Sequence, residues 1–191
     1  MAHDNIEVEI KIELSKSAFF QAKETLKTVA TFVKKNHQLD KYFIPAHRNF
    51  IKPEFPFEWL SIRTRGDAAI LSYKHWYQEN TKVATHCDEF ETKIENQEQL
   101  EKMFNALDIT PLINVEKERE IYHYNDEFEI SLDIVKELGY FIEIESLKDL
   151  GGIDITRMRL FEFAKSLGID ASQPDLRGYP YLLLKKKGLI K

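Results

Sequence analysis

Charged residues stand two positions apart in several short stretches of this chain, and that spacing determines what chemistry they can do. Side chains alternate between the two faces of a β-strand, so residues two positions apart lie on the same face. The acidic pairs are Glu7 and Glu9, Glu89 and Glu91, and Glu143 and Glu145, and the basic pairs are Arg63 and Arg65, and Lys117 and Arg119. If these stretches are strands, each of them carries a row of one sign.

Single charged residues extend these rows. Lys11 continues the row that begins at Glu7, and Lys74 and Asp133 add one charge each at equivalent places in other stretches. Several residues that flank the pairs are apolar, such as Val8, Ile62 and Ile144. We therefore expect one face of each strand to be charged and the other to pack against helices.

A charged face opposite an apolar face has two explanations. The charges either face bulk water, as in many antiparallel sheets, or line the interior of a sheet that curls on itself. For one strand alone the solvent-facing arrangement is the ordinary explanation. Protein surfaces usually mix the two signs, whereas whole stretches here are acidic or basic. The segregation of sign favours a lined interior.

The two signs call for different ligands. Clustered carboxylates repel one another unless a cation lies between them, and hard divalent cations prefer oxygen ligands. Clustered lysines and arginines need an anion, and arginine binds phosphate oxygens with two hydrogen bonds. A polyphosphate that carries Mg²⁺ or Mn²⁺ satisfies both clusters at once. Nothing in these residues calls for an organic cofactor.

Alternating patterns of polar and apolar residues predict the strands that position these groups. The stretch 7–14 alternates throughout, which is typical of a half-buried strand. The expected strands are 7–14, 38–44, 59–65, 69–75, 86–94, 115–124, 128–135 and 140–146. Gly66-Asp67, Asn125-Asp126 and Leu138-Gly139 predict short hairpin turns, so the sheet is expected to be antiparallel.

Helical spacing appears between the strands. An apolar stripe from Ser15 predicts a helix that ends near Asn36, and Asn96 with Gln99 resembles a capping box before a second helix. Further helices are expected at 154–167 and from Pro180 onward, while the proline-bearing segment 45–56 is expected to be a flap or rim. The result is an α+β chain with four helices, which are expected to pack outside the sheet.

The 191 residues suit a single domain over 1–191, and the 43% apolar content is enough for a core. A formal charge of −5 argues against nucleic-acid binding, and seven glycines disfavour a glycine-rich phosphate loop. Cys87 is the only cysteine, which excludes a disulfide within the chain. The chain has neither a signal region nor an apolar run long enough for a membrane, so we expect a cytoplasmic location without membrane contact.

With these residues in hand, the sequence resembles the CYTH family of triphosphate tunnel metalloenzymes over nearly its whole length. That family includes class IV adenylyl cyclases, thiamine triphosphatases and inorganic tripolyphosphatases. The opening signature Glu-x-Glu-x-Lys stands at residues 7–11. The further matches, in the order of the family, are Leu39-Asp40-Lys41-Tyr42-Phe43, Ile62-Arg63-Thr64-Arg65, Ser72-Tyr73-Lys74, Glu89-Phe90-Glu91, Lys117-Glu118-Arg119, Leu132-Asp133 and Leu138-Gly139-Tyr140-Phe141-Ile142-Glu143-Ile144-Glu145.

The resemblance implies an eight-stranded antiparallel closed β-barrel, a tunnel with a charged lumen and helices packed outside. It also implies site residues. The implied metal ligands are Glu7, Glu9, Glu143 and Glu145, with Asp133 and Glu91 as contributors. The implied phosphate-binding residues are Lys11, Arg63, Arg65, Lys74, Lys117 and Arg119, and the implied catalytic residues are Glu7, Glu9 and Lys11. The segment 179–184 resembles the helix that closes one mouth in some relatives.

Three functions remain open from the sequence. The opening Glu-Val-Glu-Ile-Lys-Ile lacks the Glu-Arg-Lys-Phe form common in the triphosphatases, which favours conversion of ATP to cyclic AMP and pyrophosphate. The alternatives are a triphosphate phosphohydrolase and a non-catalytic module that binds nucleotide or polyphosphate. A homodimer is possible. Many relatives carry a basic residue at the position of Cys87, so this strand is not expected to contact phosphate. His75, Trp76 and Tyr77 could flank a nucleotide base at a tunnel mouth, since aromatic faces stack on bases, but a packing or rim role is expected.

Overall fold

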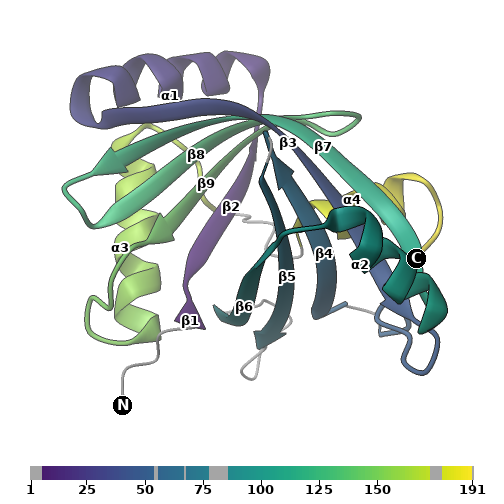
Figure 1. The fold of residues 1–191 in the computed structure, drawn as a ribbon. Helices are drawn as coiled ribbons and strands as arrows, with labels where there is room; N and C mark the ends of the chain where they lie inside the picture. Colours follow the sequence, from purple (N-terminus) through teal and green to yellow (C-terminus); the bar gives the residue numbers. More distant parts are fainter. Residues whose placement is uncertain (1–5, 54–55, 67, 78–85, 173–177, 191) are drawn as a thin grey trace.

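The computed structural model describes residues 6–53, 56–66, 68–77, 86–172 and 178–190. Strands and helices follow one another in the predicted order (Figure 1). The strands are β1 (Ile6–Glu7), β2 (Glu9–Leu14), β3 (Thr31–Pro45), β4 (Glu58–Arg65), β5 (Ala68–Tyr77), β6 (His86–Ile94), β7 (Ile109–Tyr124), β8 (Phe128–Val135) and β9 (Gly139–Ser146). The helices are α1 (Lys16–Val29), α2 (Gln97–Ala106), α3 (Ile153–Ser166) and α4 (Gly178–Lys186).

The sheet is antiparallel and its two edges meet in one stretch of chain. The strand order is β1-β6-β5-β4-β3-β7-β8-β9-β2, and β1 and β2 are separated only by Val8. Glu7 lies opposite Cys87 of β6, and Glu9 lies opposite Glu145 of β9. β1 and β2 thus form one interrupted first strand that pairs with both edges of the curled sheet and closes it. Counted in this way the barrel has eight strands, as expected, and Figure 1 shows the strands curving round from β6 to β2.

Turn residues explain where the strands reverse. Asn125 and Asp126 have φ angles of 49° and 50°, the left-handed conformation that these residue types tolerate, and the amide of Glu127 donates to the carbonyl of Tyr124 at 2.9 Å to close the turn. Glu137, between β8 and β9, also has a positive φ of 68°. Gly66 follows β4, as expected, whereas Asp67 lies outside the described residues.

The first helix is shorter than the sequence pattern predicted. Ser15 caps it, since its hydroxyl accepts a hydrogen bond of 3.1 Å from the amide of Ala18, but α1 ends at Val29 and not near Asn36. From Thr31 onward the chain is β3, which pairs with β7 along its length. The prediction was wrong because Val33 fits a helical stripe by spacing alone. Its β-branched side chain suits a strand, and β7, which begins at Ile109, provides the partner.

The apolar positions between the charged residues point outward into the helices. Ile10, Ile142 and Ile144 are fully buried in the main core cluster, and α1 and α3 pack against β2 and β9 on this side. Figure 1 shows α1 across one end of the sheet and α3 beside β9. A second cluster joins Phe104 of α2 to Ile62 of β4. With the apolar face covered, the charged residues line the inside.

None of the helices in the described ranges is long and apolar enough to cross a membrane.

Candidate active site in the tunnel

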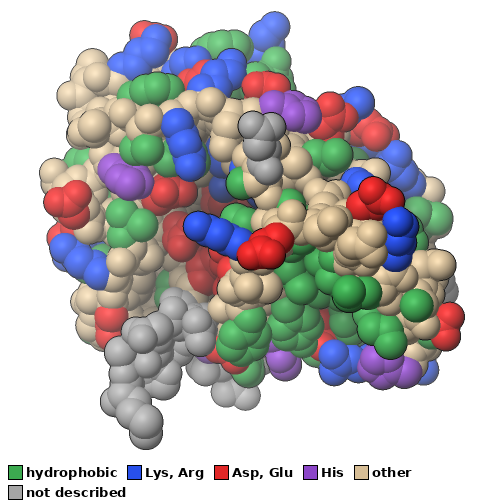
Figure 2. Space-filling model, viewed as in Figure 1, with side chains coloured by type: hydrophobic (Ala, Val, Ile, Leu, Met, Phe, Trp, Pro, Cys, Tyr) green, Lys and Arg blue, Asp and Glu red, His purple; other side chains and the backbone are tan. Residues whose placement is uncertain are grey.

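Charged side chains from six strands converge on one cavity in the tunnel. The charged residues that line it are Glu9, Lys11, Asp40, Arg63, Lys74, Lys117, Arg119 and Glu143. Figure 2 shows acidic and basic side chains sunk into a hollow on the face in view. The cavity has about 50 Å³ of free space, room for only a few water molecules. The side chains fill the tunnel because they pair with one another.

The first group of ion pairs is centred on Glu143. Lys11 lies opposite Glu143 in the β2–β9 pairing, and its Nζ is 2.8 Å from Oε2 of Glu143 and 3.2 Å from Oε1 of Glu9. The other oxygen of Glu143, Oε1, lies 3.0 Å from Nη2 of Arg119. Burial alone would raise the pKa of Glu143, but Arg119 and Lys11 outweigh it and hold that pKa well below its usual value. Glu143 is therefore ionised and bridges two cations.

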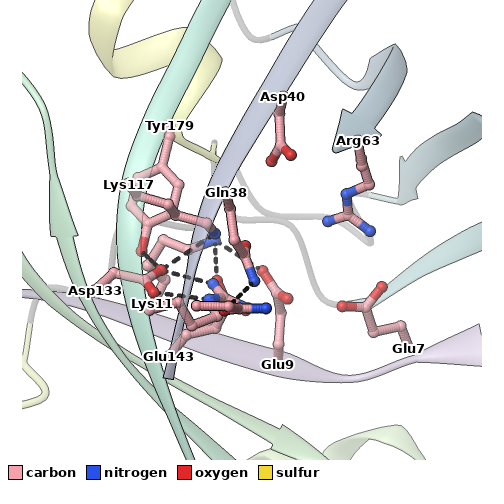
Figure 3. A network of polar contacts seen from close by, with 12 residues as sticks. Glu7, Glu9, Lys11, Gln38, Asp40, Arg63, Lys117, Asp133, Glu143 and Tyr179 are labelled. Carbon is pink, nitrogen blue, oxygen red and sulfur yellow. Dashed lines mark hydrogen bonds and ion pairs between the residues drawn. The ribbon is translucent and has the colours of Figure 1, made fainter. Parts of the chain in front are cut away.

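The second group surrounds Asp133, whose side chain is completely buried. Arg119 lies opposite Asp133 in the β7–β8 pairing and donates two hydrogen bonds to it, of 2.7 Å and 2.6 Å. Lys117 and the hydroxyl of Tyr179 in α4 donate two more, of 3.3 Å and 2.6 Å. Figure 3 shows Asp133, Lys117 and Tyr179 joined in one network with Lys11 and Glu143.

The third group lies across the tunnel on β4, β5 and β6. Nζ of Lys74 is 2.6 Å from Glu7 and 3.4 Å from Glu89. Arg63 lies 3.0 Å from Glu89 and 2.7 Å from Glu91. The side chain of Glu91 is 39% exposed, so this carboxylate belongs to the rim, whereas Glu7 is buried beside the cavity.

Arg65 is also at the edge of the site. Its Nη1 is 2.6 Å from Oδ1 of Asp40, a carboxylate that is 3% exposed. Burial acts to raise the pKa of Asp40, but Arg63, Lys117 and Arg65 lower it below its usual value. All six cations that the sequence predicted for phosphate binding thus make ion pairs inside the tunnel or at its rim.

Burial shifts the pKa of several lumen groups, and it raises the pKa of Glu7 well above its usual value. Burial, supported by the nearby carboxylates of Glu9 and Glu143, raises the pKa of Glu145 to about 8. Burial and the neighbouring Arg119 lower the pKa of Lys117 to about 8. Lys74 opposes the rise in the pKa of Glu145, but no lysine or arginine of the described segments forms an ion pair with this carboxylate as Lys11 does with Glu143. A carboxylate in this condition is suited to exchange its proton for a metal cation.

The chemistry of the carboxylates fits a hard divalent cation, although they are not gathered around one position. In the described part of the chain, no three acidic, histidine or cysteine side chains form a group that could hold a metal ion as they stand. Glu9 lies opposite Glu145, and Lys11 opposite Glu143. The ammonium group of Lys11 thus lies among the oxygens that a metal would use, and a metal would have to displace it.

The cavity has an aromatic end, formed by Tyr42, Trp59 and Trp76, and of these only Trp76 was considered from the sequence as a residue that could contact a base. Trp59 is 4% exposed, and its indole Nε1 has no hydrogen-bond partner among the described residues. Tyr42 packs edge-on against it at 5.8 Å. The alternation that exposes Arg63 to the lumen also places Trp59 there, and this signal was available. His75 lies on the outer face of β5 and stacks on Tyr77 at 4.8 Å.

Three further residues make contacts in the site that the sequence did not predict. Asp40 was noted in a family motif and Glu89 in an acidic pair, but neither was expected to form an ion pair with a phosphate-binding residue. Tyr179 was expected only in a helix that closes one mouth. Its ring lies over two lumen ammonium groups, 4.6 Å from Nζ of Lys11 and 4.8 Å from Nζ of Lys117.

Comparisons with known proteins agree with this geometry. A protein of Methanocaldococcus jannaschii named "Putative adenylate cyclase" is 33% identical over 176 residues, which cover 91% of this chain and 96% of that protein. The PH1819 protein of Pyrococcus horikoshii OT3 has a similar structure, with a TM-score of 0.79, 29% identity and coverage of 94% of this chain and 99% of that chain.

A third protein shares the fold. The Hippeastrum protein HpAC1, described as a "Putative adenylyl cyclase" that "reveals a dominant triphophatase activity", has a TM-score of 0.65 and 18% identity, with coverage of 96% of both chains. The family model described as CYTH domain matches residues 5–179. The chain therefore belongs to the CYTH domain family.

Proposed function

We propose that this protein is a divalent-metal-dependent enzyme that acts on a triphosphate, and that it converts ATP to cyclic AMP and pyrophosphate. The observation that carries the proposal is the convergence of Lys11, Arg63, Lys74, Lys117 and Arg119 on one enclosed cavity that also contains buried carboxylates. In this proposal the cations bind the phosphates, and arginine supplies paired hydrogen bonds to phosphate oxygens.

Four carboxylates are proposed to hold Mg²⁺ or Mn²⁺: Glu7, Glu9, Glu143 and Glu145. When bound, the metal neutralises charge that develops on the phosphates and orients the attacking oxygen. Lys11 touches both Glu9 and Glu143, so it is the cation that the metal would release toward the substrate. We therefore propose that Lys11 contacts a phosphate in the loaded enzyme.

The aromatic end of the cavity supports an organic triphosphate over an inorganic one. Indole rings stack on nucleobases, and such stacking contributes about 1–3 kcal/mol per base. The unpartnered Nε1 of Trp59 is a donor for an acceptor atom of that group. In the proposed reaction the ribose 3′-oxygen forms a bond to the α-phosphorus and gives its proton to water, while the bond from that phosphorus to the bridging oxygen breaks and pyrophosphate leaves.

A triphosphate phosphohydrolase is the second candidate. The same cations and metal would hold the substrate, and water would attack the terminal phosphate in place of the ribose hydroxyl. The fold is compatible with this reaction, since the Hippeastrum relative described above is reported to have dominant triphosphatase activity. The name of the relative from Methanocaldococcus jannaschii supports the cyclase.

A binding module without turnover is the third candidate. A protein that only binds an anion gains nothing from buried carboxylates beside it, because they repel the ligand and compete for the cations. Glu9 is 3% exposed and Glu143 is 7% exposed, so the pair Glu7 and Glu9 and the pair Glu143 and Glu145 each include a deeply buried acid. This observation favours an enzyme.

A homodimer and a cytoplasmic location stay predictions.

Product identification separates the three candidates. Purified protein is incubated with Mg²⁺ or Mn²⁺ and with ATP, tripolyphosphate or thiamine triphosphate, and the products are identified by chromatography. Cyclic AMP with pyrophosphate supports the cyclase, and orthophosphate supports the phosphohydrolase. If nothing turns over while ATP with metal raises the melting temperature, the protein is a binding module. The variant Glu9→Gln should lose turnover, whereas Glu13→Gln, at an exposed site on the same strand, should keep it.

A further inference from the structure

The Asp133 carboxylate is held by four protein donors. Its Oδ2 accepts hydrogen bonds from Nη2 of Arg119, Lys117 and Tyr179, and its Oδ1 accepts one from Nε of Arg119, so Oδ2 has no lone pair left for another ligand. Its side chain is 0% exposed. A metal could bind Oδ2 only if one of these donors withdrew, and a buried donor left without a partner is costly.

Tyr179 is fixed around this contact. It is 4% exposed and lies in the first turn of α4, with its ring packed edge-on against Phe141 at 5.0 Å. Its hydroxyl is 2.6 Å from Oδ2 of Asp133. At the other end of the same helix, Nζ of Lys187 lies 3.0 Å from the carboxylate of Glu137 in the β8–β9 turn. Both ends of α4 are thus attached to β8 and to the turn that follows it.

The structure assigns Asp133 and Tyr179 to a positioning pair: Tyr179 holds the Asp133 carboxylate, and that carboxylate orients Arg119 and Lys117 toward the triphosphate. The inference rests on the proposed function, because it names what these two cations bind. It differs from the expectation that Asp133 contributes to the metal site.

The geometry of Arg119 explains how the pair acts. Nε and Nη2 of the guanidinium are engaged by Asp133, and Nη2 also contacts Glu143. Arg119 nevertheless lines the cavity, and its remaining nitrogen, Nη1, makes no hydrogen bond to the described residues. A planar group held along one edge presents the other edge in a fixed direction. Asp133 thus fixes the direction in which Arg119 donates to a phosphate.

The test removes one hydroxyl. In Tyr179→Phe the ring and its packing remain, and only the donor to Asp133 is lost. Tyr140→Phe is the matched control, since Tyr140 faces outward and packs against Phe19 of α1 at 5.0 Å. We expect the KM for the triphosphate to rise about 10-fold in Tyr179→Phe, because one hydrogen bond to a charged group is lost. The dissociation constant of the triphosphate, measured by calorimetry with Ca²⁺, should rise by the same factor. The kcat should stay within about 2-fold, and Tyr140→Phe should match the wild type.

Asp133→Asn tests the same pair from the other side. The Mn²⁺ dissociation constant is measured by electron paramagnetic resonance with tripolyphosphate at saturation. A positioning role predicts weaker triphosphate binding and an unchanged Mn²⁺ dissociation constant. A large loss of Mn²⁺ affinity with normal triphosphate binding would show that Asp133 is a ligand, and would overturn the inference. If Asp133→Asn does not fold, Tyr179→Phe decides.

The failures of the two proposals are distinguishable. A wild-type protein that binds neither ATP nor tripolyphosphate would reject the proposed function, and this inference with it. A wild-type protein that binds them, together with a Tyr179→Phe variant that has the same KM and dissociation constant, would reject the inference alone.

Discussion

Replacement of Glu143 by glutamine tests whether carboxylates and phosphates compete for the same cations. Glu143 accepts from two cations on different strands, Lys11 at 2.8 Å and Arg119 at 3.0 Å. Each cation has a second carboxylate, Glu9 for the lysine and Asp133 for the arginine. Glutamine keeps the shape of the side chain and removes its charge. The variant therefore weakens two ion pairs without emptying the site.

The expected loss of stability follows from burial. Removing one partner of a buried ion pair costs about 3–5 kcal/mol, and the retained carboxylates place the expected loss near the lower end, about 3 kcal/mol. For a chain of this size, each kcal/mol lowers the melting temperature by about 2–4 °C. Glu143→Gln should therefore melt about 6–12 °C below the wild type.

The same change should strengthen binding of a metal-free anion. In the wild type, tripolyphosphate must separate Lys11 from Glu143 before it can bind that ammonium group, and the charge of Glu143 beside Arg119 repels it. Each hydrogen bond to a charged group contributes about 1.5–3 kcal/mol, and 1.4 kcal/mol corresponds to about a tenfold change in affinity. We expect tripolyphosphate to bind Glu143→Gln at least about 10-fold more tightly than it binds the wild type when metal is absent.

Calorimetry with a chelator present measures this affinity, and thermal unfolding measures the stability. Glu13→Gln is the control, because Glu13 is exposed near the end of the same strand as Lys11. With Mn²⁺ restored, Glu143→Gln should lose turnover. Equal metal-free affinity in the wild type and the variant would refute the idea that the ion pairs hold the cations away from the substrate.

Three further predictions follow from the site. Burial raises the pKa of Glu145 to about 8 in the folded state, whereas the unfolded chain loses this proton at lower pH. The contribution of this group to the free energy of unfolding is therefore complete below the unfolded pKa. It is lost as the pH rises through about 8. Unfolding free energies between pH 5 and 9 should show this decline in the wild type and less of it in Glu145→Gln. Trp59→Phe should raise the KM for ATP several-fold and leave that for tripolyphosphate unchanged, and a common change in both would contradict a base-binding role. Glu7→Gln and Glu9→Gln should each abolish turnover, with circular dichroism unchanged, and full activity in both would reject the metal assignment.

The sequence predicted which side chains would face the tunnel because that depends only on the two-residue period of a strand. Glu9, Lys11 and Arg119 needed no knowledge of the other strands. The choice of partner could not be predicted in the same way, because it depends on the register between strands. Asp40 lies opposite Arg63 in the strand pairing, but its 2.6 Å ion pair is with Arg65, and the local sequence pattern does not predict that partner.

Contacts that depend on distant segments were also beyond the sequence. Tyr179 reaches Asp133 across 46 positions of the chain, and only the docking of α4 brings them together. The end of α1 was misplaced for a related reason. Thr31 begins a strand because β7 is there to receive it, and helical spacing cannot report whether such a partner exists.

The first strand, β1 with β2, pairs with both edges of the sheet, so the closure of the barrel and two of the proposed metal ligands depend on the same few residues. On one side of Val8, Glu7 pairs with β6 and contacts Lys74; on the other side, Glu9 pairs with β9. A proteolytic cut at Val8 would free the edge of β6, which could then join another chain, and would remove Glu7 in the same event. A nicked molecule would thus have an open sheet and, under the proposed function, would lack one of its metal ligands.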